Sequence, residues 1–339
     1  MITMKGWGVA CVLLAGVLNA SFMLPMKRIK AWPWENVWLI YSMVGMVILP
    51  WTLALSTVPR LGDVYRNTAW SVLVKVVLFG MAWGGGSTLF GIGVRRVGMA
   101  LGYSLIFGIT ASFGSLFPLL FLHPESLMSG QGWTLMGGTA LVMVGLIFLC
   151  IAGRMREREM RVTTSAVAFS GFAMGLVICI FSGLFSSMLN FSFIFGIDLQ
   201  HLASSFGSSP TMSANSIWCL TLSAGFIVNA ICCGRLLSKN HTWHLLWEPG
   251  FASCWMSALL MAFIWFGCIV AYGIGAASLG VLGGIVGWPL LMSMTVVGAN
   301  AWGVLTGEWK GARRSSLSYW CVGLASLLLA IYLISRGAT

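Results

Sequence analysis

The stretch WGGGSTLFGIGVRRVGMALG (83–102) occurs a second time in altered form, as WFGCIVAYGIGAASLGVLGG (265–284). The two stretches align without a gap at an offset of 182 positions. Their identical pairs are Trp83/Trp265, Gly85/Gly267, Gly91/Gly273, Ile92/Ile274, Gly93/Gly275, Gly98/Gly280 and Gly102/Gly284, and Phe90/Tyr272 is a conservative further match. Shared apolar composition explains spaced glycines and aromatics poorly, so the chain is predicted to use one structural unit twice.

The composition around this repeat is that of a membrane protein. Of the 339 residues, 58% are hydrophobic and only 8% are charged, whereas a soluble domain carries about 25% charged residues. The formal net charge of +11 does not indicate a nucleic-acid partner, because the cations lie in short loops between apolar segments. The chain is therefore predicted to be a polytopic membrane protein whose surroundings are the lipid bilayer.

Ten apolar segments are long enough, at about 20 residues each, to cross a hydrocarbon layer of ~30 Å. They are expected at 6–26, 37–56, 71–93, 98–122, 131–153, 166–195, 214–236, 252–276, 281–305 and 316–335. The first segment has no clear cleavage site, so we interpret it as a retained helix and not as a signal peptide. The predicted fold is all-α, with ten transmembrane helices.

The basic residues are distributed unequally between the two sides of this topology. Fourteen Lys and Arg residues follow the first, third, fifth, seventh and ninth segments, whereas Lys5, Arg60, Arg66 and Arg336 belong to the other side and Lys75 lies near the outer end of the third segment. Because loops rich in Lys and Arg stay in the cytoplasm, both termini are predicted to lie outside.

The offset of 182 positions relates the third and fourth segments to the eighth and ninth, five spans later. An odd number of spans places the two copies in opposite orientations across the bilayer. A weaker resemblance between 14–21 and 181–188 extends the pattern. We therefore predict a five-plus-five inverted repeat, 1–160 and 161–339, forming one transmembrane domain that works by alternating access. The pairs Gly98/Gly102 and Gly280/Gly284 are expected to bring helices close together.

The ionisable residues exclude several function classes. All eight acidic residues and all four histidines fall at predicted helix ends or in loops, and the nine cysteines show no metal-binding spacing. No metal cage, Ser/His/Asp set or carboxylate pair can be assembled from them. The sequence thus argues against an enzyme, against a cofactor or metal, and against an ion channel built on charged rings.

Neutral polar and aromatic side chains remain within the predicted spans. Amides donate and accept hydrogen bonds to hydroxyl groups, and aromatic rings cover apolar C–H faces, so such a set suits a neutral polyol. The candidate substrate-binding residues are Asn19, Trp83, Phe90, Asn190, Trp265, Tyr272, Trp288 and Asn300. Taken singly, each could instead belong to an interfacial aromatic belt or tie helices together.

Two acidic motifs lie at the inner ends of the predicted helices. Pro25 is expected to end the first helix, and Pro33 to start the next one, with Glu35 in its first turn. Glu308 stands beside Trp309 at the end of the ninth helix. Glu35 and Glu308 are candidates for proton coupling or gating, and an inner-surface salt-bridge cluster is the alternative.

These motifs resemble the L-rhamnose–proton symporter family of the drug/metabolite transporter superfamily, as a divergent subgroup. The resemblance rests on PMK (25–27), WPWE (32–35), ILPW (48–51), FGMAWG (79–84), Gly98 and Gly102 with Met99 between them, EW (308–309) and GARR (311–314). It implies a ten-helix inner-membrane protein of bacteria that imports L-rhamnose or a similar deoxy-sugar together with protons.

Three functions therefore remain open from the sequence. The first is a neutral-sugar importer that works by proton symport. The second is a proton-independent facilitator, or an exporter, of another small neutral metabolite. The third is a membrane receptor or scaffold, against which the inverted repeat argues.

Overall fold

The computed structural model describes residues 4–29, 31–159, 169–280 and 282–338, and these residues form helices joined by short connections. In this part of the chain, ten helical segments are long and apolar enough to cross a membrane, as predicted. They are Met4–Arg28, Trp34–Thr57, Trp70–Val97, Leu101–Leu122, Gly130–Arg156, Phe172–Ser205, Asn215–Lys239, Ala252–Ser278, Gly283–Leu305 and Arg314–Ala338.

The individual α-helices subdivide some of these spans. They are α1 (Met4–Ser21), α2 (Trp34–Met43), α3 (Leu49–Thr57), α4 (Leu61–Asn67), α5 (Trp70–Val97), α6 (Met99–Leu122), α7 (Gly130–Glu159), α8 (Phe169–Ser186), α9 (Met188–Phe195), α10 (Ile197–Ser205), α11 (Asn215–Lys239), α12 (Ala252–Ser278), α13 (Gly283–Leu305) and α14 (Arg314–Ala338). The π turn Val44–Ile48 joins α2 to α3 within one span.

Proline sets the connection between the first two spans, as expected. After α1 ends, Pro25 starts a short 3-10 turn, Pro25–Arg28. Pro33 then stands at the N-cap of α2, where its missing N–H is not needed. Glu35 lies in the first turn of α2, where the helix dipole favours a negative charge.

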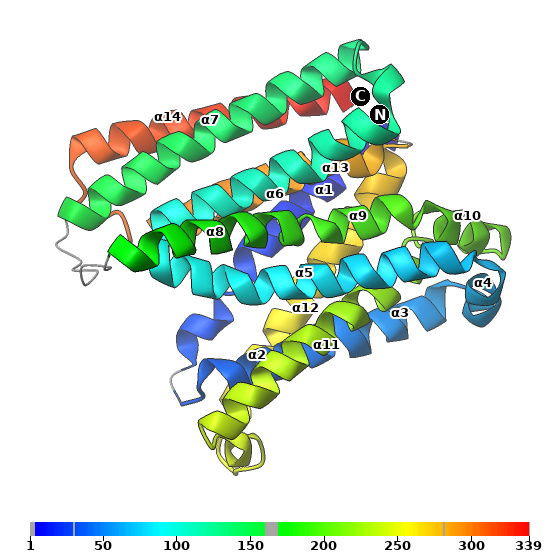
Figure 1. Cartoon of the computed structure of the whole chain (residues 1–339), viewed down its shortest axis with the longest axis horizontal. Helices are drawn as coiled ribbons and strands as arrows, with labels where there is room; N and C mark the ends of the chain where they lie inside the picture. Colours follow the sequence, from blue (N-terminus) through cyan, green and yellow to red (C-terminus); the bar gives the residue numbers. More distant parts are fainter. Residues whose placement is uncertain (1–3, 30, 160–168, 281, 339) are drawn as a thin grey trace.

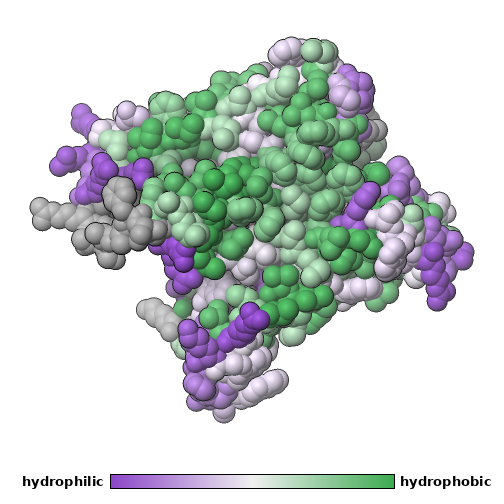
Figure 2. All heavy atoms as spheres, in the orientation of Figure 1, coloured by the Kyte–Doolittle hydropathy of each residue, from purple (hydrophilic) through white to green (hydrophobic). Residues whose placement is uncertain are grey.

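The helices form a bundle whose two ends are polar. In Figure 1, α7 and α14 run side by side along one edge, α2, α3 and α11 lie at the opposite edge, and the remaining long helices fill the middle. Figure 2 shows an apolar band between hydrophilic ends, as a protein that crosses a bilayer requires. We call the end that carries Lys27, Arg96, Arg156 and Arg314 the basic end, and the opposite end the far end.

The two halves of the chain make matching contacts. In the first half α1 packs on α12 and α13, and in the second half α8 packs on α5 and α6. Gly93 of α5 and Gly275 of α12 are repeat partners, and each allows a close helix contact. A Cβ added at Gly93 would lie 2.7 Å from Cys179 Sγ on α8, and one added at Gly275 would lie 2.7 Å from the Gly8 carbonyl oxygen on α1.

The structure corrects the expected role of two glycines. Gly98 and Gly280 do not bring helices together: a Cβ on either would meet no atom within 4 Å. Both precede the second helix of their pair with positive φ, 90° and 83°, a conformation that glycine adopts without steric cost. Gly102 and Gly284 do pack closely, against Val94 and Phe193 respectively.

Two further expectations concern the connections. No helix was predicted between the segments 166–195 and 214–236, but helix α10 lies there and packs on α4 at the far end. Each of these two helices has fewer than ten residues and cannot cross a bilayer by itself. In the structure α10 continues the sixth span, Phe172–Ser205, beyond its predicted end at 195. The predicted boundary between the repeats, 160/161, lies outside the described residues.

Candidate functional site

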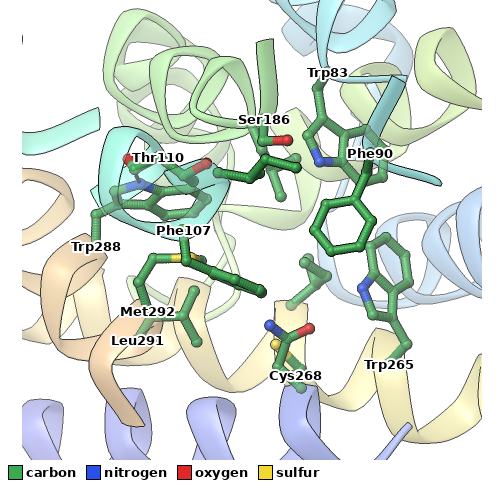
Figure 3. A pocket seen from close by; sticks show the side chains of 14 residues that line it. Trp83, Phe90, Phe107, Thr110, Ser186, Trp265, Cys268, Trp288, Leu291 and Met292 are labelled. Atoms are coloured by element: carbon green, nitrogen blue, oxygen red, sulfur yellow. Dashed lines mark hydrogen bonds between the residues drawn. The ribbon is translucent and has the colours of Figure 1, made fainter. Parts of the chain in front are cut away.

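A cavity of about 130 Å³ lies in the middle of the bundle, between helices of both halves. Its walls come from α1, α5, α6, α8, α9, α12 and α13. An apolar cavity of ~150 Å³ holds one benzene molecule, so this one has the size for a ligand of about one ring. Most of the wall is apolar or aromatic (Figure 3).

Two tryptophans from equivalent positions of the repeat meet in this wall. The rings of Trp83 and Trp265 are stacked, with centroids 5.7 Å apart and an interplanar angle of 12°. Figure 3 shows both rings on one side of the cavity together with Phe90, and Trp288 on the other side. The duplicated stretch therefore contributes the same residue twice, at the point where the two copies meet.

The polar groups of the lining are few and neutral. Asn19 donates through its amide nitrogen to the Thr295 hydroxyl, 3.1 Å away. The Thr110 hydroxyl donates to the Gly183 carbonyl at 3.1 Å, and Ser186 adds a second hydroxyl. Among the described residues that line the cavity, none is acidic, basic or histidine. A charged ligand would find no counter-charge here, whereas a neutral ligand needs none.

Five of the eight predicted substrate-binding residues line the cavity: Asn19, Trp83, Phe90, Trp265 and Trp288. The other three lie outside this lining. Asn300 accepts a hydrogen bond from the Trp320 indole at 2.8 Å and donates to the Val296 carbonyl at 2.9 Å. It therefore ties α13 to α14.

Asn190 and Tyr272 form a buried cross-link on the far side of the cavity. The Asn190 amide nitrogen donates to the carbonyl oxygens of Gly114 and Gly284, at 2.8 and 2.9 Å. The Tyr272 hydroxyl donates to the Asn190 side-chain oxygen. Neither side chain is exposed. This cross-link connects α6, α9, α12 and α13, and we call it the Asn190 network.

Glu308 takes part in an ion-pair cluster at the basic end. Lys27 Nζ lies 3.1 Å from Glu308 Oε1, and Arg156 Nη1 lies 3.9 Å from Glu308 Oε2. Arg156 also covers the ring of Trp309, with 5.1 Å to its centroid. The cluster therefore joins the ends of the first, fifth and ninth spans. All three charged side chains are partly exposed, so each pair contributes under about 1 kcal/mol.

A second carboxylate at the basic end joins the end of α7 to the start of α14. Glu159, at the end of α7, accepts a hydrogen bond from the Ser316 hydroxyl at 2.7 Å and another from the Arg313 backbone N–H at 2.9 Å. The hydrogen bond from Ser316 lowers the pKa of the Glu159 carboxyl below its ordinary value.

Glu35 differs from Glu308 because it is buried and is paired with neutral groups. It is 6% exposed, and its Oε1 accepts from the Asn240 amide at 2.7 Å and from the Thr242 hydroxyl at 3.5 Å. Within the described residues, no cation lies within 4.0 Å of it.

A row of aromatic rings on α2 runs from Glu35 toward the cavity. Trp38 follows Glu35 by three positions and packs on Tyr41, with ring centroids 5.0 Å apart. Tyr41 meets Trp265 edge to face at 5.8 Å. Residues three positions apart share one face of a helix, so Glu35 and the cavity wall are joined along a single face of α2.

The sequence held a signal for two lining residues that we did not predict, Ile106 and Ser186. Ile106 and Thr110 stand 182 positions before Trp288 and Met292, and all four line the cavity. Ser186 occupies the same place in 181–188 that Asn19 occupies in 14–21. Projecting Trp288 and Asn19 through the repeat would have identified Ile106 and Ser186, whereas Thr110 and Met292 correspond to each other and neither was a candidate. No such signal marks Phe107 or Cys268.

In the part of the chain that the structure describes, neither a metal site nor a disulfide lies near the cavity. All nine cysteines are free thiols. Within the described residues, no group of three His, Cys, Asp or Glu side chains is placed to hold a metal ion.

Comparison with known proteins gives a consistent picture over the whole chain. Residues 2–339 match the family model described as L-rhamnose-proton symport protein (RhaT). Similar proteins named L-rhamnose-proton symporter include one from Klebsiella pneumoniae subsp. pneumoniae, 28% identical over 338 residues, and one from Cronobacter sakazakii, 26% identical over 337 residues. Each alignment covers 97% of this chain and 97% of the relative.

One solved crystal structure superposes on the chain with a TM-score of 0.55. The match covers 98% of this chain and 99% of the other, at 16% identity. This likeness supports the ten-helix fold alone.

Proposed function

Because the chain belongs to the L-rhamnose-proton symport protein family, we propose that it imports L-rhamnose or a similar deoxy-sugar together with protons. It is a transporter and not an enzyme, and it crosses the bacterial inner membrane with ten helices. The observation that carries the proposal is the central cavity, which has the size for one ring and neutral, largely aromatic walls.

The chemistry of the wall suits a sugar with one apolar end. The aromatic faces of Trp83 and Trp265 can cover the C–H groups of a pyranose ring. The amide and hydroxyls of Asn19, Thr110 and Ser186 offer partners for the sugar hydroxyls. Deoxy-sugars carry a methyl group where most hexoses carry a hydroxymethyl group, so a mostly apolar cavity favours them.

We further infer that the protein works by alternating access through a five-plus-five inverted repeat, with both termini outside. The matching contacts of α1 and α8 support the repeat, as do the equivalent positive φ angles of Gly98 and Gly280. The cavity lies where the two copies meet, as in transporters built this way.

The ends of the bundle supply two gates under this proposal. At the far end the Asn190 network closes the route from the cavity. At the basic end the cluster of Lys27, Arg156 and Glu308 joins three spans through weak, half-exposed pairs. Contacts of this kind can form in one facing state and break in the other, so Glu308 is assigned to gating.

Proton coupling requires a group that takes up and releases a proton, and the described lining of the cavity has no carboxyl, imidazole or amine. Glu35 is assigned this role, because it is buried, lacks a cation within the described residues and is joined to Trp265 by the aromatic row. The site assignments of Glu35 and Glu308 can be separated by experiment.

In proteoliposomes, L-rhamnose added outside is expected to cause saturable uptake and alkalinisation of the outer medium. Glu35→Gln, which mimics the protonated carboxyl, is expected to abolish the alkalinisation while counterflow exchange of labelled sugar continues. Glu308→Gln is expected to slow sugar uptake and alkalinisation and to leave the ratio of the two rates unchanged. Uptake is followed with labelled sugar and proton movement with a pH dye.

Glu125→Gln serves as the control, because Glu125 is an exposed carboxylate outside both clusters. Saturable uptake by the wild type without any proton movement would leave a facilitator and would refute the symport part. Normal alkalinisation by Glu35→Gln would remove Glu35 from the coupling site.

A further inference from the structure

Among the described residues, Asn19 is the only amide side chain that lines the cavity. An amide has two different ends, since its oxygen accepts hydrogen bonds and its nitrogen donates them. The direction in which the amide points decides which kind of ligand group it can bind. The orientation of the Asn19 amide therefore affects which ligands the cavity selects, and the neighbours of Asn19 determine that orientation.

Thr295 on α13 is the partner that decides the direction. Its hydroxyl lies 2.8 Å from the Leu291 carbonyl oxygen, one turn earlier in the same helix. A hydroxyl has a single hydrogen to donate, and here it donates to Leu291. Thr295 is 5% exposed and does not line the cavity, so its hydroxyl bonds to groups of the protein and not to a ligand in the cavity.

With its hydrogen used, the Thr295 oxygen can only accept. Asn19 Nδ2 lies 3.1 Å from that oxygen and donates to it. A flipped amide would place two acceptor oxygens against each other, unless the hydroxyl hydrogen left its shorter bond to Leu291. The chain from Leu291 through Thr295 to Asn19 therefore fixes the amide with its nitrogen toward α13.

This orientation leaves the side-chain oxygen of Asn19 for a ligand. Among the described residues, no donor bonds to that oxygen. Thr110, another polar lining residue, donates its hydroxyl hydrogen to the Gly183 carbonyl. The cavity therefore presents an oriented acceptor at Asn19, which requires a donating hydroxyl from the sugar.

We propose that Thr295 is a positioning residue that holds Asn19 as a hydrogen-bond acceptor, and that this contact selects sugars carrying a free hydroxyl at one ring position. The inference rests on the proposed sugar transport and adds the residue that sets its selectivity. A neutral hydrogen bond of this kind contributes about 0.5–1.5 kcal/mol, so a ligand without the donor binds up to about tenfold more weakly.

The test measures dissociation constants of the full-length protein in nanodiscs for L-rhamnose and for analogues in which one hydroxyl at a time is replaced by fluorine. Fluorine cannot donate a hydrogen bond. The wild type is expected to bind one of these analogues about tenfold more weakly than L-rhamnose. Thr295→Val keeps the branched shape without the hydroxyl and is expected to lose this discrimination, whereas Thr295→Ser retains it.

A structural role alone would not produce this pattern, because a loosened helix would weaken all the sugars equally. Thr295→Ala provides a second hydroxyl-free variant with a smaller side chain and is expected to behave as Thr295→Val does. If the hydroxyl-free variants discriminate among the analogues as the wild type does, the inference is overturned. If the wild type binds none of the sugars, the proposed function fails instead.

Discussion

Gly84→Ala is expected to destabilise the protein by about 3 kcal/mol, although it adds one methyl group. A Cβ at this position would lie 2.5 Å from the carbonyl oxygen of Gly225 and 2.8 Å from its Cα. These are backbone atoms of α11, so no side-chain rotation relieves the clash. Overpacking of this kind costs about 1–3 kcal/mol, and here α5 and α11 would have to separate.

The close contact continues one turn away and explains the size of the effect. A Cβ at Gly80 would lie 2.3 Å from the Thr221 carbonyl oxygen. Gly80 and Gly84 of α5 thus face Thr221 and Gly225 of α11, and small residues four apart let two membrane helices touch along their backbones. Lipid is as apolar as the helix surface, so this packing is a main source of their association.

Gly85→Ala is the matched control, one residue further along the same helix. Its Cβ would meet only Phe185, at 4.0 Å, and alanine favours a helix by up to about 1 kcal/mol over glycine. Thermal unfolding in detergent measures both variants. Equal melting temperatures for the two would contradict the backbone contact between α5 and α11.

Asn190→Leu is expected to destabilise the protein by about 3 kcal/mol, because it removes the centre of the Asn190 network at similar side-chain volume. Three hydrogen bonds are lost together: those from the Asn190 amide to the carbonyl oxygens of Gly114 and Gly284, and that from the Tyr272 hydroxyl, which keeps only its 3.3 Å contact with the Gly284 carbonyl. Each buried polar group left without a hydrogen bond costs about 1–3 kcal/mol, although membrane proteins often recover part of this.

Tyr272→Phe removes the hydroxyl that donates to Asn190 and, at 3.3 Å, to the Gly284 carbonyl, and is expected to cost about 1 kcal/mol. Because both residues share the hydrogen bond between them, the double variant is expected to lose less stability than the sum of the single variants. The stabilities for this double-mutant cycle are measured by unfolding in heat or detergent, followed by tryptophan fluorescence. Strict additivity would show that Tyr272 and Asn190 do not interact in the folded protein.

The fold could be predicted from the sequence because its strongest signals are long and local. Each span is a run of about 20 apolar residues, which only a helix can carry across a bilayer. Shorter features were not predicted: no helix was expected where α10 lies, between the segments 166–195 and 214–236, and Gly98 was expected to pack closely although its positive φ turns the chain. Such features depend on contacts and backbone angles that composition does not encode.

The cavity could be predicted in part. Trp83 and Trp265 were found through the repeat, and the structure stacks them in the cavity wall. Asn19 and Asn190 could not be distinguished by sequence, since both are amides in apolar helices. Asn19 lines the cavity, whereas Asn190 uses its amide hydrogens on two backbone carbonyls. The difference arises from which helices come together around each amide.

The central claim is that a sugar binds in the cavity where the two copies meet, and the most direct measurement compares L-rhamnose binding by two tryptophan variants. Trp265→Ala removes half of the stacked wall, and Trp247→Ala removes an indole that is 82% exposed. Lost contact with one indole corresponds to about 2 kcal/mol, or about thirtyfold in affinity.

Calorimetric titration of the purified wild type and of both variants gives their dissociation constants for L-rhamnose. The account predicts saturable binding by the wild type, binding about thirtyfold weaker by Trp265→Ala, and unchanged binding by Trp247→Ala. Wild-type affinity in Trp265→Ala would contradict the account, because the sugar would then bind elsewhere.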